Sequence, residues 1–128
     1  MNFLDIAKAN FEKWNAALQT KSPAKVAELY SDDCTFLPTL SPEFKHGKKE
    51  AELYFEHFLK KNPAGKIVDE KIQKLGEESY LHSGLYNFEI DQDGARVNVD
   101  ARFTCVWRKL EGGSWNIIHH HSSVRPAA

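Results

Sequence analysis

Cysteine is scarce in this chain of 128 residues: Cys34 and Cys105 are the only two, and no Cys-x-x-Cys pair occurs. Both lie in apolar segments typical of strands, where a cysteine is usually a buried free thiol, so we expect no disulfide. The sequence also lacks an apolar run of about eighteen residues, the length needed to span a membrane. Residues Met1–Asp5 include an early acid and do not resemble a secretory signal, so we expect a cytoplasmic protein with no membrane contact.

An excess of positive charge is missing as well. Lys and Arg number 17 against 18 Asp and Glu, for a formal net charge of -1, and no basic cluster is large enough to follow a phosphate backbone. We therefore expect no nucleic-acid partner. Motifs for nucleotide or flavin binding are absent, so the sequence predicts no cofactor.

The composition is that of an ordinary globular protein, with 41% hydrophobic and 27% charged residues. A chain of this length buries roughly two thirds of the surface that it exposes when unfolded. We therefore predict a single domain over residues 1–128.

The first half of the chain predicts helices. Apolar residues recur at steps of three and four from Phe3 to Leu18, which indicates an amphipathic helix. The pair Ser22-Pro23 is typical of a helix start and predicts a short second helix over residues 24–30. An apolar stripe predicts a third helix over residues 48–60.

The segment between the second and third helices predicts a turn, a strand and a loop. Residues Ser31–Asp33 are typical of a turn, and Cys34–Leu37 of a short extended segment. The loop Thr39–Ser41 lies between two prolines, and we expect it to border a site.

The second half of the chain predicts strands. Residues 80–90, 97–108 and 115–124 alternate between two faces, and residues 67–75 do so more weakly. Helices followed by an antiparallel meander predict the α+β fold class, with N-terminal helices packed on a curved antiparallel sheet that encloses a cavity.

Strand alternation also divides the side chains between the two faces of this sheet. We expect the inner face to carry mainly aromatic and apolar groups, with two tyrosines added from the helices: Tyr86, Phe88, Phe103, Cys105, Trp107, Ile118, His120 and Ser122, with Tyr30 and Tyr54. We expect the outer face to carry polar groups: Arg102, Thr104, His119, His121 and Ser123.

The run His119-His120-His121 invites a metal interpretation, because His119 and His121 are two residues apart on one strand face. A metal site needs a third ligand, and the spacing brings no other histidine (His46, His57 or His82) close, so we expect no metal. We interpret the five outer polar residues instead as a hydrogen-bonded layer buried between subunits, with Asp100 or Glu89 as acceptors.

His120 differs from its neighbours because it faces the cavity. There an imidazole among aromatic side chains could orient a ligand or move a proton, with Tyr86 or Tyr54 beside it. The alternative is a buried histidine held by tyrosine or backbone groups. No Gly-x-Ser-x-Gly elbow accompanies Ser122 or Ser123, so a serine hydrolase is not expected. The predicted ligand pocket comprises Tyr54, Tyr86, Phe103, Cys105, Trp107, His120 and Ser122.

Five segments carry a resemblance to a known family: Leu37–Ser41, Tyr54–Leu59, Ser83–Tyr86, Ala101–Thr104 and Trp115–Ser123. The chain resembles the NTF2-like superfamily, in the branch of the calcium/calmodulin-dependent protein kinase II association (hub) domain and its stand-alone SgcJ/EcaC-like relatives. The resemblance implies a cystatin-like cone that self-associates through its sheet, as a dimer or as a ring of dimers. It also implies a pocket for a small ligand.

The chain departs from that family in its pocket. The kinase hub has arginines, thought to bind carboxylate ligands, at positions that align with Tyr86, Cys105 and Ser122, and none of these is arginine here. The kinase signatures His-Arg-Asp and Asp-Phe-Gly are absent, so the chain is not itself a kinase.

Two functions remain as hypotheses. The first is a non-catalytic homo-oligomerisation domain, hub-like, with a cavity for a small molecule. The alternative is an isomerase, cyclase or dehydratase of the SnoaL or ketosteroid-isomerase-like type, in which His120 and Tyr86 act in the cavity.

Overall fold

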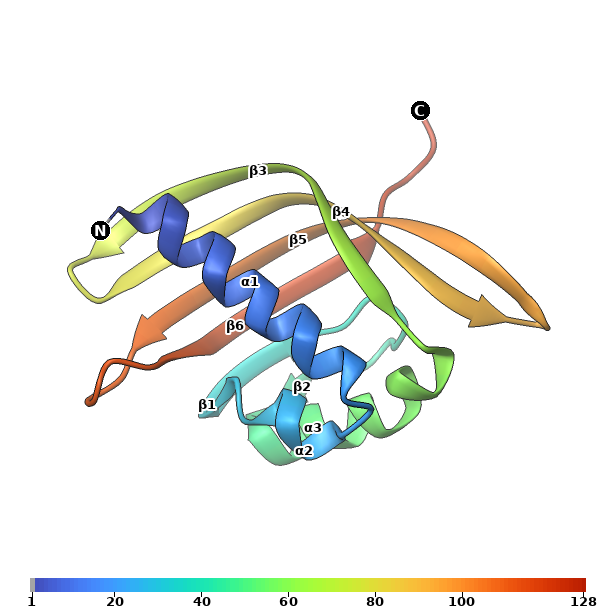
Figure 1. The fold of residues 1–128 in the computed structure, drawn as a ribbon, viewed down its shortest axis with the longest axis horizontal. Helices are drawn as coiled ribbons and strands as arrows, with labels where there is room; N and C mark the ends of the chain where they lie inside the picture. The colour runs from blue at the N-terminus through green and yellow to red at the C-terminus, as the bar shows by residue number, and fades with distance from the viewer. Residues whose placement is uncertain (1) are drawn as a thin grey trace.

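The computed structural model describes residues 2–128, which form helices at the N-terminal end and a six-stranded sheet (Figure 1). The helices lie on one side of the sheet, which curves over them, so the predicted α+β architecture is confirmed. The elements in chain order are α1 (Phe3–Gln19), α2 (Pro23–Ala27), β1 (Tyr30–Leu37), β2 (Lys45–His46), α3 (Gly47–Phe58), a 3-10 turn (Leu59–Lys61), β3 (Ala64–Gly76), β4 (Ser79–Gln92), β5 (Ala95–Lys109) and β6 (Trp115–Val124).

Local sequence signals fix the starts of the first two helices. The side chain of Asn2 caps α1 by accepting a hydrogen bond from the backbone N–H of Asp5 at 2.9 Å. Ser22 caps α2 in the same way, and Pro23 occupies the first helical position as predicted. The apolar face of α1 is buried against the sheet, where Trp14 is 4% exposed.

The sheet order is β2-β1-β6-β5-β4-β3, and β1 pairs with β6 in parallel. The predicted antiparallel meander is confirmed for β3 to β6, whereas the parallel pairing of β1 with β6 was not predicted. Tyr30 and the segment Ser31–Asp33 belong to β1, so the expected end of the second helix and the expected turn are wrong. The cause is long-range pairing: Tyr30 is aligned with Ile117, whose N–H donates to the carbonyl of Leu29 at 2.7 Å, and this overrides local propensity.

A β-bulge changes which face the first residues of β6 present. Trp107 is aligned with Ile117 and Val106 with His119, so Ile118 is an extra residue on β6. Ile117 is consequently buried, at 1% exposed, and Ile118 is half-buried on the other face. The prediction that Ile118 faces inward was wrong because alternation assumes a strand without bulges. After the bulge, His120 and Ser122 face inward as expected.

The interior between the helices and the sheet is rich in aromatic side chains. Large side chains from all layers meet there: Trp14, Tyr30, Phe36, Tyr54, Phe55, Phe58, Tyr86, Phe88, Phe103 and Trp107. Cys34 and Cys105 are both buried free thiols. No helix within residues 2–128 is long and apolar enough to cross a membrane.

Candidate functional site

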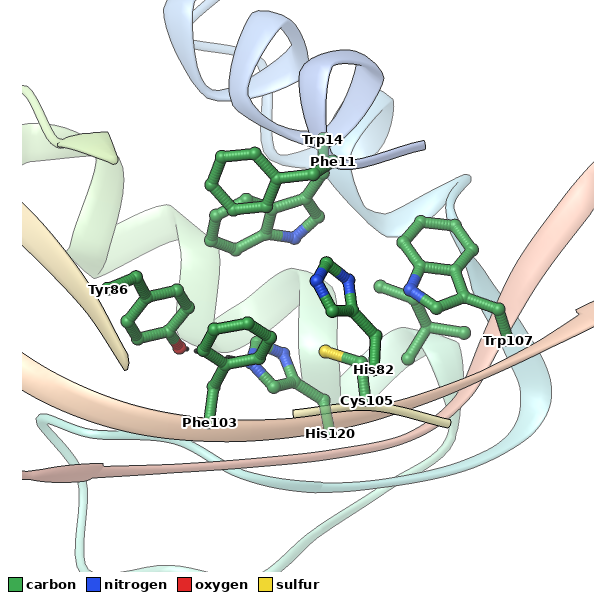
Figure 2. Close-up of a pocket in the computed structure, with 9 residues that line it drawn as sticks. Phe11, Trp14, His82, Tyr86, Phe103, Cys105, Trp107 and His120 are labelled. Carbon is green, nitrogen blue, oxygen red and sulfur yellow. Dashed lines mark hydrogen bonds between the residues drawn. The ribbon is translucent and has the colours of Figure 1, made fainter. Parts of the chain in front are cut away.

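Two small cavities adjoin one another in the interior, and each has a volume of about 10 Å³. Trp14, Tyr86 and His120 line both. That volume matches a single water molecule, so most of the space inside the cone is filled by side chains. Figure 2 shows the first cavity, with Phe11 and Trp14 of α1 facing side chains that rise from the sheet.

His120 lies at the centre of this interior, 2% exposed and stacked on Phe36 with ring centroids 4.9 Å apart. Its Nδ1 atom is 2.9 Å from the hydroxyl of Tyr30, and its Nε2 atom is 3.2 Å from the hydroxyl of Tyr86. Both ring nitrogens are therefore hydrogen-bonded, one to Tyr30 of β1 and the other to Tyr86 of β4.

The neighbours of these tyrosines give the hydrogen bonds a direction. The indole N–H of Trp14 donates to the hydroxyl of Tyr30 at 3.1 Å, which leaves the Tyr30 proton for Nδ1 of His120. The Tyr86 hydroxyl donates to Ser122 at 2.5 Å, so it accepts from Nε2–H of His120. Ser122 is in turn hydrogen-bonded to Thr39. His120 is thus a neutral imidazole with its proton on Nε2.

Burial accounts for the electrostatics of this chain of hydrogen bonds. Desolvation, with His119 and His121 as smaller contributors, lowers the pKa of His120 to about 3. Desolvation likewise raises the pKa values of Tyr30 and Tyr86 well above the ordinary value for tyrosine. All three groups are neutral over the physiological range, which favours the interpretation of His120 as a buried histidine held by tyrosines.

The residues predicted to form a ligand pocket lie together. Phe103, Cys105 and Trp107 line the first cavity, Tyr54 and Ser122 the second, and Tyr86 and His120 both. The loop after β1, expected to border a site, contributes Thr39 to the second cavity. Whether a ligand enters this space stays a prediction.

Sequence reasoning missed several lining residues: Phe11, Trp14, His82 and Ile117. The helical periodicity of α1 marks Phe11 and Trp14 as inward, but it does not show which part of the sheet they cover. His82 shares the alternation of Tyr80 and Tyr86, and that pattern alone would have placed it inside.

His82 is the second buried histidine of the interior, at 2% exposed. Its Nε2 atom is 3.0 Å from a carboxylate oxygen of Glu70 on β3. Burial lowers the pKa of His82, and the hydrogen bond and charge of Glu70 oppose that shift. His82 and His120 line the same cavity, although no group of three His, Cys, Asp or Glu side chains within residues 2–128 is arranged to hold a metal ion.

The predicted polar layer lies on the outer face of the sheet, away from the helices. Arg102, Thr104, His121 and Ser123 border a shallow hollow of about 100 Å³. None of these four forms a side-chain hydrogen bond within the described part of the chain. His119 differs because its Nδ1 atom is 2.7 Å from the hydroxyl of Thr35 on β1.

Asp100 and Glu89, the acceptors expected for this layer, do not form hydrogen bonds with its side chains within residues 2–128. The carboxylate of Asp100 accepts from Asn87 at 2.7 Å, and its carbonyl accepts from the backbone of Arg125 at 2.8 Å. Glu89 is exposed. Neither acceptor therefore forms a hydrogen bond with a side chain of this layer within residues 2–128.

Apolar side chains accompany the polar ones on the outer face. Leu81, Leu85, Val106 and Ile118 are half-buried there, on three neighbouring strands, and Leu81 is aligned with Val106. The helices lie on the opposite side of the sheet, so no helix within residues 2–128 covers this face (Figure 1).

Comparisons with known proteins support the resemblance seen in the sequence. The family model described as the calcium/calmodulin dependent protein kinase II association domain matches residues 4–126. Among solved structures, a Xanthomonas campestris protein named for this association domain is 42% identical, with a TM-score of 0.90 over 95% of this chain and 87% of that one. A search of curated proteins gave no significant match.

More distant structures share the fold. A CaMKII hub homology domain from Chlamydomonas reinhardtii is 20% identical, with a TM-score of 0.80 over 98% of this chain and 100% of that one. A Streptomyces avermitilis protein of the NTF2-like family, named as a candidate dehydratase, is 14% identical, with a TM-score of 0.82 over 97% of each chain. The predicted NTF2-like cone is therefore confirmed.

Proposed function

The chain belongs to the calcium/calmodulin-dependent protein kinase II association domain family, and on that premise we propose that it is a non-catalytic homo-oligomerisation domain. The subunits associate through the outer face of β4, β5 and β6, as a dimer that can join into a ring of dimers. The interior cavity serves a small molecule. The observation that carries the proposal is the outer face itself, which combines apolar and unpaired polar groups and has no helix over it.

The chemistry of this face fits a protein partner. Leu81, Leu85 and Val106 supply the apolar centre that stable interfaces need, and Arg102 and Thr104 supply hydrogen-bonding groups beside it. A specific interface buries about 800 Å² on each partner, which a broad three-stranded face can provide. A second copy of the same chain satisfies both sets of groups through a two-fold axis, because the two patches are then identical.

Catalysis by His120 and Tyr86 is the weaker alternative. A general base needs a free lone pair at the ligand, but Nδ1 of His120 accepts from Tyr30 and Nε2–H donates to Tyr86. A substrate would have to displace one tyrosine from a closed chain of hydrogen bonds. Stabilisation of the interior explains this arrangement without any reaction.

Light scattering coupled to size exclusion tests the proposal directly. The subunit mass is 14.6 kDa, and we expect a species of at least twice that mass at micromolar concentration. A monomer at that concentration would contradict the proposal.

A further inference from the structure

Among residues 2–128, His82 is the buried histidine that is paired with a carboxylate, that of Glu70. His82 rises from β4 at 2% exposure, and the side chain of Glu70 reaches it from β3 while remaining only 22% exposed. Carboxylates are rarely buried unless they are paired, and a pair of apolar residues would fill the same space at lower cost. Packing of the sheet alone therefore does not explain why a carboxylate, that of Glu70, lies at this position.

The backbone is shaped to place this carboxylate. Ile67 is aligned with Tyr86 and Asp69 with Leu85, so Val68 is an extra residue that forms a bulge in β3. Without the bulge, alternation from the inward Ile67 would turn Glu70 to the outer face. With it, Glu70 faces inward beside His82. Bulges that redirect a side chain in this way are common next to functional sites.

Gly84 makes room for the same arrangement. It is aligned with Glu70, and a Cβ atom on it would lie 2.1 Å from the carbonyl oxygen of Asp69 and 2.9 Å from the Cα of Glu70. Only a residue without a side chain permits this close approach of the two strands. The bulge and the glycine together position one carboxylate against one imidazole.

The remaining nitrogen of His82 is available to the cavity. A carboxylate only accepts, so Nε2 of His82 donates its proton to Glu70 and the Nδ1 atom of the neutral ring carries a lone pair. No second hydrogen bond to this ring forms within residues 2–128. In Figure 2 the His82 ring extends into the space between Trp14 of α1 and the sheet, beside Cys105 and Trp107.

We propose that His82, oriented by Glu70, is the hydrogen-bond acceptor of a binding site for a small, mainly apolar molecule that presents one hydroxyl group, such as a phenol. The site deepens the ligand part of the proposed function and uses a different residue from His120. Aromatic walls suit the apolar body of such a ligand, and Nδ1 accepts its O–H. Glu70 strengthens the acceptor by holding the opposite side of the ring.

Phe11 marks the entrance to the site. It is half-buried, whereas the other described residues of the lining are buried. The cavity of about 10 Å³ accommodates one water molecule, so an aromatic ligand enters when the Phe11 side chain turns aside. Entry of a ligand therefore requires a rotamer change of this half-buried side chain on α1.

The tautomer of His82 is the first test, and it needs no ligand. Nitrogen-15 NMR of histidine-labelled protein at pH 7 shows which ring nitrogen carries the proton. We expect protonation at Nε2 and a free lone pair at Nδ1. A proton on Nδ1, or a doubly protonated ring, would overturn the proposal.

Binding of two matched probes is the second test. Fluorine NMR compares 4-fluorophenol with 4-fluorotoluene, which has nearly the same shape and no O–H donor. We expect the wild-type preference for the phenol to fall about tenfold in His82→Phe, since one hydrogen bond in a dry site is lost. If His82→Phe does not fold, Glu70→Gln is measured in its place and should also lower the preference for the phenol. The control is His57→Phe on the exposed face of α3, which should leave this preference unchanged.

The results of these experiments distinguish a failure of the proposed ligand site from a failure of the proposed oligomerisation. Failure of both probes to bind the folded wild-type protein, or an unchanged preference in the folded His82 or Glu70 variant, would overturn the proposal. The mass of the same samples by light scattering reports assembly independently. A correct mass without probe binding rejects the site alone, and a monomer that binds the phenol rejects assembly alone.

Discussion

The hydroxyl of Tyr30 lies 2.9 Å from Nδ1 of His120, although 90 residues separate them in the chain. This bond joins the start of β1 to the middle of β6, the one parallel pair of the sheet. It is also the centre of a chain of hydrogen bonds that runs from Trp14 to Thr39 and leaves His120 no free nitrogen. The polar groups around His120 are thus satisfied within the described chain, whereas the side chains of Arg102, Thr104, His121 and Ser123 form no hydrogen bond within residues 2–128.

Tyr30→Phe tests the cost of breaking this chain. The substitution removes the acceptor of Trp14 and the donor to His120 together, while Tyr80→Phe removes only the acceptor of Asn10. We expect the free energy of unfolding to fall by about 1 kcal/mol more in Tyr30→Phe, because each buried group without a partner is costly. Urea denaturation at one fixed protein concentration measures both. Equal losses would contradict the double role of Tyr30.

His120 should make the protein sensitive to acid. Its pKa is about 3 in the folded state and near 6.5 when unfolded, so the stability due to the neutral ring is complete above pH 6.5. It is lost as the pH falls from 6.5 toward 3, at up to about 1.4 kcal/mol per pH unit. We expect His120→Gln to show a shallower decrease of unfolding free energy between pH 6.5 and 4 than the wild type.

A matched control is His57→Gln, which alters an exposed histidine of α3. It should follow the wild-type curve. His82 and His119 also have lowered pKa values, so the His120 variant should retain some acid sensitivity. Parallel curves for His120→Gln and the wild type would contradict the assignment of a neutral His120.

Gly84→Ala should disturb the contact between β3 and β4. The added methyl group would overlap the carbonyl oxygen of Asp69, and separation of the strands would move Glu70 away from His82. We expect a loss of about 2 kcal/mol in unfolding free energy, typical of overpacking. Gly76→Ala is the control, because its methyl group would lie at an ordinary 3.4 Å from Ser79. A stability loss no larger than that of Gly76→Ala would contradict the close approach.

Assembly should weaken in acid if His119 is neutral in the interface. Burial and the neighbouring His121 lower the pKa of His119, so its protonation is opposed in the folded protein and proceeds below its ordinary range. We expect the mass by light scattering to fall between pH 8 and pH 5, and to fall less in His119→Gln. An assembly unchanged over this range would reject the prediction.

The fold could be predicted where local patterns and tertiary pairing agree. The apolar periodicity of α1, the Ser22-Pro23 start of α2 and the alternation of β4 and β5 determine their elements directly. Prediction of secondary structure failed where pairing with a strand distant in the sequence determines the conformation of a residue. Tyr30 continues an apolar helical pattern, yet its alignment with Ile117 makes it a strand residue.

Bulges set a similar limit on predicting the site. Alternation placed Tyr86, His120 and Ser122 inside correctly, because β4 pairs with β5 without a bulge and the β6 bulge at Ile118 precedes both His120 and Ser122. It misplaced Ile118 and gave no sign that Glu70 turns toward His82, since both depend on one extra residue in a strand. A bulge is set by contact with the neighbouring strand and leaves little signal in the sequence.

A substitution at Val106 tests the proposed position of the subunit interface. Val106 lies among the apolar side chains of the outer face, whereas Leu53, 46% exposed on α3, lies on the helical side. Sedimentation equilibrium should show that Val106→Glu raises the dissociation constant at least about 100-fold, because an unpaired carboxylate is then buried between subunits. Leu53→Glu should leave the dimer intact. A dimer that survives Val106→Glu with wild-type affinity would contradict assembly through this face.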